Sequence, residues 1–232
     1  MTKKIEKNAL AFIKLMIEIT IRIASYDKEG KLIGRSSGFL YKKNSDSIPI
    51  VITAGHKLPE EGSFIETNIV KDGSILQINA GKFNVFHNHD DIDYAYSELP
   101  VDLYKKEIEK YDGICLRPYN NNFTPIDEQE AYGFAVVNDY LEFVKLGDIN
   151  ALASYSCYEV GLEFIKQNEH INYFKPLNFQ GHEFYRGASG SPVADPEGKI
   201  TGIIIGGTEE GLLRVFRLDN IDFSIGEDEV KL

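Results

Sequence analysis

The sequence predicts an all-β fold in which short strands form barrels. Apolar or alternating runs of four to ten residues recur along the 232-residue chain, and clusters of glycine, asparagine, aspartate and proline separate them. Sustained helical periodicity is scarce. Many short strands with regular turns and few helices are typical of β-barrel architectures.

The N-terminal elements are the least regular. Apolar residues could line one helical face over 3–13, although this stretch is short for a helix. From Met16 the sequence alternates, with isoleucines at every second position to Ile23, which predicts a half-buried strand over 16–23. A turn at 27–30 then leads into an apolar run over 32–41, so we expect a hairpin.

The later strand candidates are bounded by polar turns. They cover residues 49–54, 65–70, 75–78, 92–99, 129–137, 141–146, 151–158, 161–165, 198–207 and 212–218, with a further strand beginning at Pro192. Residues 100–125 are polar, aromatic and rich in turn residues, which favours a connection without regular structure.

Composition excludes some classes of partner. Lysine and arginine total 25 against 36 aspartates and glutamates, a net charge of −11. Nucleic-acid surfaces and anionic membranes both require clustered cations, so we expect neither as a partner. No apolar run approaches the roughly 20 residues of a membrane-spanning helix, and the apolar N-terminal stretch is interrupted by Lys14 and Glu18, unlike a signal peptide.

The chain has two cysteines, Cys115 and Cys157. They could form one disulfide, but so few cysteines are more typical of thiols in a reducing compartment. We therefore expect a cytoplasmic protein.

Three motifs carry residues of a nucleophilic site. The turn at 187–192 (GASGSP) holds Ser189 between glycines, which permit backbone angles that other residues resist. Such a serine is a candidate nucleophile where a base and an acid are available. The run at 51–56 (VITAGH) ends on His56, and the run at 91–96 (DIDYAY) contains Asp93.

Chain order narrows the class of hydrolase. The order Ser, Asp, His of α/β-hydrolases is excluded because no histidine follows Ser189. The order Asp, His, Ser of subtilisin would need Asp27 or Asp46, and neither stands at a strand end beside an apolar run. The order His56, Asp93, Ser189 remains.

With T-A-G-H at 53–56, D-Y-A-Y at 93–96 and G-x-S-G-S-P at 187–192, the chain resembles the chymotrypsin-like serine peptidases over about residues 37–218. The resemblance implies two antiparallel β-barrels with the active site between them. The first, 1–105, would carry the histidine and aspartate; a connection, 106–125, would follow; and 126–232 would carry the nucleophile. It also implies an intracellular bacterial or phage-type member that needs no cofactor and no metal.

The resemblance assigns roles within the triad. His56 would be the general base and Ser189 the nucleophile, with Asp93 orienting the imidazole. Asp91 is the rival acid, because Asp91-Ile92 also fits the motif, whereas Asp93 is followed by the expected Tyr-Ala-Tyr. Residues two apart in a strand face the same way, so periodicity cannot separate the two aspartates.

The backbone N–H groups of Gly187 and Ser189 would form the oxyanion hole. Ala188 departs from secreted trypsins, which carry there an aspartate that pairs with the N-terminus freed by zymogen cleavage. Its absence predicts that the site is formed constitutively or is ordered by an activating or targeting protein partner, without a cleavage step.

Substrate contacts are predicted at two places. Glu183 lies six residues before the nucleophile, where the family lines the base of the pocket for the P1 side chain. A carboxylate there would favour Lys or Arg at P1; the alternative is a different loop path that leaves Glu183 solvated. Gly206 and Gly207 would leave the pocket rim open, at the end of a strand that pairs with the substrate backbone.

Two neighbouring groups are weaker candidates. The stretch 87–91 (HNHDD) has ligand-type side chains, but its spacing, without a further ligand, favours a solvated loop over a metal site. His182 and Arg186 stand beside the nucleophile turn, where they could contact substrate. The sequence thus predicts a serine endopeptidase, with a catalytically inactive peptide-binding or sensor module as the alternative.

Overall fold

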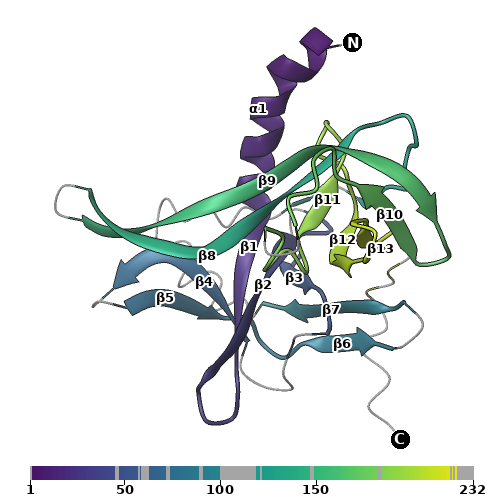
Figure 1. Ribbon diagram of the computed structural model, residues 1–232. Coiled ribbons are helices and arrows are strands. Elements are labelled where there is room, and N and C mark those ends of the chain that lie inside the picture. Colours follow the sequence, from purple (N-terminus) through teal and green to yellow (C-terminus); the bar gives the residue numbers. More distant parts are fainter. Residues whose placement is uncertain are drawn as a thin grey trace, which may run out of the picture.

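The computed structural model describes residues 2–44, 47–56, 58, 63–71, 74–88, 91–99, 119–120, 122–146, 149–181, 184–219, 221 and 223. One helix, α1 (Thr2–Ile19), precedes thirteen strands in this part of the chain (Figure 1). The strands are β1 (Thr20–Tyr26), β2 (Leu32–Tyr41), β3 (Ile50–Thr53), β4 (Ser63–Lys71), β5 (Ser74–Asn79), β6 (Asn84–His87), β7 (Asp93–Glu98), β8 (Tyr132–Leu146), β9 (Ile149–Gln167), β10 (Ile171–Lys175), β11 (Pro192–Ala194), β12 (Ile200–Gly207) and β13 (Leu213–Arg217).

The N-terminal strands form a curled antiparallel sheet, a half-barrel. Its order is β5-β4-β1-β2-β3-β7-β6, and every pair is antiparallel. Strand alternation places one apolar set inside the curl, where it is excluded from water. This set comprises Ile21, Ile23, Leu40, Val51, Ile65, Ile78, Ala80 and Leu99.

The C-terminal strands form a closed barrel of six strands. The ring runs β8-β9-β10-β13-β12-β11 and returns to β8 through the pairing of Ala194 with Gly133. Closure removes the sheet edges, and aromatic and aliphatic side chains fill the interior. The buried residues of that interior are Tyr132, Phe134, Val136, Leu162, Phe174, Ala188, Val193, Ile204, Leu213 and Val215.

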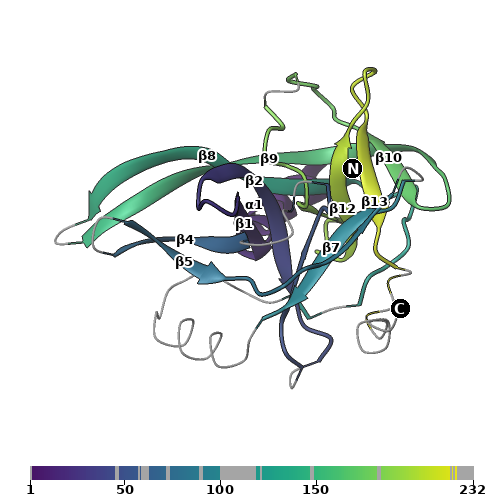
Figure 2. The same cartoon turned by 90° about the horizontal axis from the view of Figure 1, so that it is seen from below.

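A third apolar cluster joins the two units. Phe39 and Ile52 from the half-barrel pack in it with Ile171, Ile203 and Phe216 from the barrel. The long β8–β9 hairpin also reaches from the barrel to β4, where Ala151 pairs with Ile69 (Figure 2). The predicted all-β fold with two barrel-like units is confirmed, the first unit being a curled half-barrel.

The prediction of a strand beginning at Met16 is wrong for its first four residues, because α1 continues to Ile19. The helical spacing of Phe12, Met16 and Ile19 puts these side chains on one buried face, whereas Ile17, which completes the alternation, is 37% exposed. Gly133 provides the space for this packing, since a Cβ there would lie 2.6 Å from the Phe12 ring.

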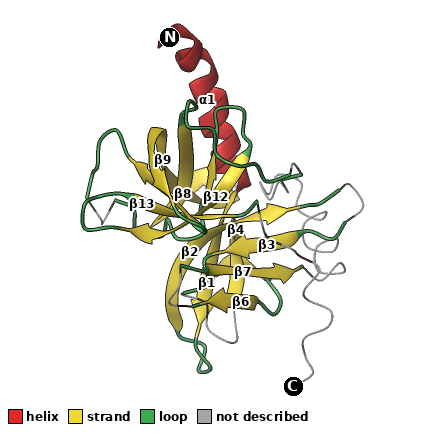
Figure 3. Ribbon diagram, turned by 90° about the vertical axis from the view of Figure 1, so that its right-hand side faces the viewer, coloured by secondary structure: helices red, strands yellow, loops and turns green. Residues whose placement is uncertain are grey.

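The N-terminal end of α1 projects away from the strands, and its C-terminal end lies against them (Figure 3). In the described part of the chain, no helix has the length and apolar character that crossing a membrane requires.

Two long strands replace four predicted short ones. The candidate at 129–137, from Tyr132 on, and the candidate at 141–146 are parts of β8, and those at 151–158 and 161–165 are parts of β9. Residues 138–140 of β8 coincide with a register shift, and Gly161 of β9, with a positive φ of 78°, lies at a second shift. Such irregularities bend strands without ending them. Strand β10 was not predicted.

The proposed connection at 106–125 is described only at 119–120 and 122–125. There, the Tyr119 N–H donates to the Leu40 carbonyl of β2 and the Tyr119 carbonyl accepts the Lys42 N–H, while the Thr124 N–H donates to the Ile200 carbonyl. The boundaries at 105 and 125 remain predictions. Cys115 lies outside the described residues, so the state of the two thiols also stays a prediction.

Candidate active site

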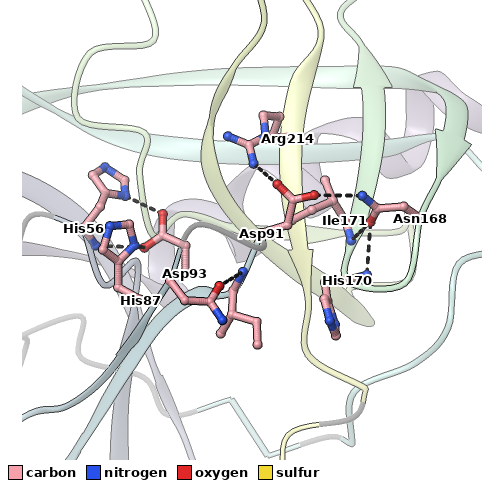
Figure 4. Close-up of polar contacts among 10 residues, drawn as sticks. His56, His87, Asp91, Asp93, Asn168, His170, Ile171 and Arg214 are labelled. Carbon is pink, nitrogen blue, oxygen red and sulfur yellow. Dashed lines mark hydrogen bonds and ion pairs between the residues drawn. The ribbon is translucent and has the colours of Figure 1, made fainter.

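His56 and Asp93 are brought together by neighbouring strands. His56 follows β3, Asp93 begins β7, and the two strands pair antiparallel, with Thr53 opposite Ala95. The Asp93 carboxylate makes two contacts with the histidine. The His56 backbone N–H donates to Oδ1 over 2.8 Å, and the ring Nδ1 lies 2.6 Å from Oδ2 (Figure 4). Two contacts from one carboxylate fix both the position and the plane of the imidazole.

The electrostatics of this pair favour an ionised carboxylate. Burial by itself would raise the pKa of Asp93, which is 7% exposed, but the hydrogen bonds and charge of His56, assisted by the charge of His87, hold this pKa below its ordinary value. A carboxylate can only accept, so the His56 proton resides on Nδ1. Nε2 is then left as the acceptor, which is the tautomer that a general base needs.

Asp91, the rival acid, makes different contacts. It lies just before β7 with a positive φ of 71°, so the expectation that both aspartates face the same way in one strand does not apply. Its carboxylate accepts from the Arg214 guanidinium on β13 and from the Asn168 amide over 2.9 Å (Figure 4). Asp91 thus ties the half-barrel to the barrel, and Asp93 is the aspartate that contacts His56.

The turn that carries Ser189 is closed by its own backbone. Gly187 and Gly190 have φ of 86° and 89°, which favour glycine, and Ser191 N–H donates to the Ala188 carbonyl over 2.8 Å. Gly190 N–H donates to the Ile204 carbonyl over 2.7 Å. These bonds hold the turn against β12, on the wall of the barrel.

The same turn is anchored to the half-barrel through Ser37 on β2. Ser37 N–H donates to the Ser189 carbonyl over 2.8 Å, and its hydroxyl donates to the Gly187 carbonyl over 2.7 Å. The Thr53 hydroxyl in turn donates to the Ser37 carbonyl over 2.7 Å. Thr53 lies three residues before His56, so a continuous chain of hydrogen bonds links the serine turn to the strand that leads to the histidine.

Ser189 and His56 are not joined directly. Within the described residues, the Ser189 hydroxyl makes no hydrogen bond, either to His56 or to another group. The N–H groups of Gly187 and Ser189 likewise make no backbone hydrogen bond there, whereas that of Ala188 between them donates to Tyr185 over 3.0 Å. Catalytic hydrogen bonds are often long without substrate, and donors that are not engaged can bind a substrate oxygen.

A small open cavity of about 120 Å³ lies beside Ser189. Gly206 and Gly207 line it, and its other walls are mostly apolar; their role as substrate contacts stays a prediction. Those walls are Phe179, Tyr185, Ala188, Ile204, Leu212 and Leu213. Glu183 and His182 lie outside the described residues, and Arg186 is not part of the lining.

A buried carboxyl stands behind one wall of this cavity. The Tyr185 hydroxyl donates to Oε1 of Glu159 over 3.2 Å, and burial raises the pKa of both groups, that of Tyr185 to about 12. Glu159 was not predicted as a site residue, because nothing in the sequence of its strand distinguishes an inward-facing carboxyl from a solvated one.

One group of carboxylates has metal-ligand spacing in the described residues. Glu130, Asp195 and Glu197 have oxygens within 4.8 Å of one another. The Asp195 carboxylate already accepts the backbone N–H groups of Glu197 and Lys199, and the Lys199 ammonium lies 3.1 Å from Glu197. These contacts explain why the carboxylates lie close together, since they form a charged turn.

Comparisons with known proteins address the fold. No family model matches the chain, and no curated protein matches it either. The solved inactive form of the Rv3671c protease aligns over 89% of this chain and 87% of its own, with 11% identity and a TM-score of 0.52. The fold is chymotrypsin-like.

Two further solved structures are similar to this chain at slightly lower TM-scores. The active form of the Rv3671c protease from M. tuberculosis has 12% identity and a TM-score of 0.49, over 89% of this chain and 79% of that one. A serine protease of human pathogenic astrovirus has 14% identity and a TM-score of 0.49, over 89% and 93%.

Within this chymotrypsin-like fold, two residues near the predicted triad were missed as site residues. Ser37 has no sequence signal, since its role arises from contacts 150 residues away. His87 was noted only as part of the stretch 87–91, yet its Nδ1 lies 3.4 Å from Oδ1 of Asp93. The antiparallel pairing of β6 with β7, two adjacent alternating runs, is the signal that could have indicated it. His89 and Asp90 lie outside the described residues.

Proposed function

We propose that this chain is a serine endopeptidase with the triad His56, Asp93 and Ser189. The observation that supports it most is the double contact of Asp93 with His56. In addition, Thr53, on the strand that leads to His56, is hydrogen-bonded to Ser37, and Ser37 is hydrogen-bonded to the Ser189 turn. This arrangement gives the imidazole the right tautomer and attaches the nucleophile to the same framework.

In the proposed reaction, Ser189 Oγ attacks the carbonyl carbon of a peptide bond while His56 Nε2 takes the hydroxyl proton. Asp93 stabilises the imidazolium that forms. The N–H groups of Gly187 and Ser189 bind the developing oxyanion, at roughly 3 kcal/mol per donor. His56 then returns the proton to the leaving amine, and water, activated by the same imidazole, releases the acyl group and restores the hydroxyl of Ser189.

No cofactor takes part in this scheme, and the partner is a peptide or protein substrate. The low cysteine content supports a cytoplasmic location. Because Ala188 cannot pair with a freed N-terminus, we keep the proposal that activation, if any, comes from a protein partner.

Fluorophosphonate labelling tests the proposed nucleophile. We expect covalent labelling of Ser189, detected by mass spectrometry, and its loss in Ser189→Ala and His56→Ala, because the hydroxyl is a poor nucleophile without its base. His170→Ala is the matched control: it removes an imidazole that stacks on Phe216, away from Asp93, and should label normally. An unlabelled wild-type chain that still binds peptides would support the inactive binding module instead.

Substrate preference at P1 is a separate part of the proposal. The apolar walls of the cavity can enclose the methylenes of Lys or Arg, and Glu183 would then meet the charge. Glu183→Gln is expected to reduce the preference for basic over neutral P1 residues by about tenfold or more, measured as the ratio of kcat/KM for paired peptides. An unchanged ratio would place Glu183 in solvent and favour an apolar P1 residue.

A further inference from the structure

The Asp93 carboxylate has a second imidazole beside it. His87, the last residue of β6, is directly opposite Asp93, the first residue of β7, in the antiparallel register. Side chains at opposed positions project from the same face of the sheet, so this register alone brings them together. The His87 Nδ1 lies 3.4 Å from Asp93 Oδ1, the oxygen that also accepts the His56 N–H (Figure 4).

The two histidines differ in solvent access. The side chain of His87 is 50% exposed and that of His56 is 22% exposed, while the carboxylate between them is 10% exposed. His87 can therefore exchange a proton with water readily. The distance of 3.4 Å, without a hydrogen bond to Asp93, makes its influence on the carboxylate mainly one of charge.

The charged and titratable groups that face His87 in the described residues come from two elements. They are Asp93 on β7 and His56 after β3, whose ring centre is 6.5 Å from that of His87. Asp91, two residues before Asp93, has its charge paired with Arg214 on β13. Asn88, the neighbour of His87, is neutral and binds the Ile92 N–H.

We infer that His87 is a positioning residue of the proposed triad: its imidazolium shares the Asp93 carboxylate with His56 and disfavours a second proton on His56. The effect of His87 on activity rests on the proposed function, whereas its effect on the protonation of His56 does not. His56 acts as a base only while Nε2 is unprotonated. A positive charge on His87 therefore opposes the protonation of Nε2 by Coulomb repulsion, and the acid limb of activity should lie at lower pH than in a variant without that charge.

The expected size follows from the distance. Two unit charges 6.5 Å apart in a water-like medium shift one another's titration by about half a pH unit. The substitutions His87→Gln and His87→Lys separate charge from shape, because both remove the imidazole but only lysine keeps a positive charge. If His87 had a merely structural role, both substitutions would shift the titration midpoint of His56 in the same direction.

The test is an NMR titration of the His56 ring in the full-length chain, assigned with a His56→Gln variant. We expect the His56 midpoint to be highest in His87→Gln, lowest in His87→Lys and intermediate in wild type, with about half a pH unit between the extremes. The acid limb of kcat/KM should follow the same order. His170→Gln, which removes another part-exposed imidazole, should leave the midpoint unchanged.

Coincident midpoints, or the reverse order, would overturn the role of His87. The NMR titration requires no turnover, so it decides this inference even if the chain hydrolyses no peptide. In that event the proposed peptidase activity fails separately, through the absence of fluorophosphonate labelling and of cleavage by the wild-type chain.

Discussion

Asp93→Asn is expected to lower kcat by about 10⁴-fold with little change in folding. The amide group can donate through its nitrogen, so it permits the His56 proton to move to Nε2, the nitrogen that must accept from Ser189. In the wild type the carboxylate also faces Nδ1 at 2.6 Å and stabilises the imidazolium as it forms, whereas the neutral amide of the variant cannot. Steady-state kinetics on a peptide substrate, together with circular dichroism to monitor folding, measure this effect.

Asp91→Asn is the matched control, since it makes the same chemical change two residues away. It removes the charge that pairs with Arg214, in a contact about one-third exposed on each side. Pairs of this kind contribute about 0–1 kcal/mol, so kcat/KM should fall by no more than about fivefold. A larger loss in Asp91→Asn than in Asp93→Asn would reassign the acid of the triad.

Gly190→Ala is expected to lower both stability and activity. A Cβ at this position would lie 1.9 Å from the Ser37 carbonyl oxygen and 2.4 Å from the Thr53 hydroxyl, with φ at 89°. The positive φ costs about 1–2 kcal/mol, and relief of the clash must move either the serine turn or β2, for a total of about 3 kcal/mol or more. Displacing Ser189 by about 1 Å should reduce kcat/KM by about 100-fold.

Gly181→Ala separates the effect of the positive φ from that of the steric clash. Gly181 has the same φ of 89°, but a Cβ there would meet no atom within 4 Å. We expect a loss of about 1 kcal/mol in that variant and near-normal kinetics. Denaturant unfolding of both variants gives the free energies of unfolding. Equal losses in the two proteins would show that contact with Ser37 and Thr53 does not constrain the turn.

The candidate site was predictable where a motif is local. The positive-φ turn around Ser189 needs glycines within four residues, and His56 and Asp93 stand at the ends of apolar runs, so each was visible in the sequence. The choice between Asp93 and Asp91 was not visible, because two residues of separation carry no information about which carboxylate faces a ring 37 positions earlier. The proposed roles of Ser37 and His87 depend in the same way on contacts between distant segments.

The fold shows the same division. Alternation and turn residues by themselves determined an all-β chain and most of its strand positions, because both are properties of neighbouring residues. The extension of α1 to Ile19 was decided by packing: Phe12, Met16 and Ile19 bury against the barrels, and this outweighs the alternation of isoleucines. Which side chains share a carboxylate, a turn or a cavity was likewise decided only by the tertiary structure, because strand register brings together residues that the sequence keeps far apart.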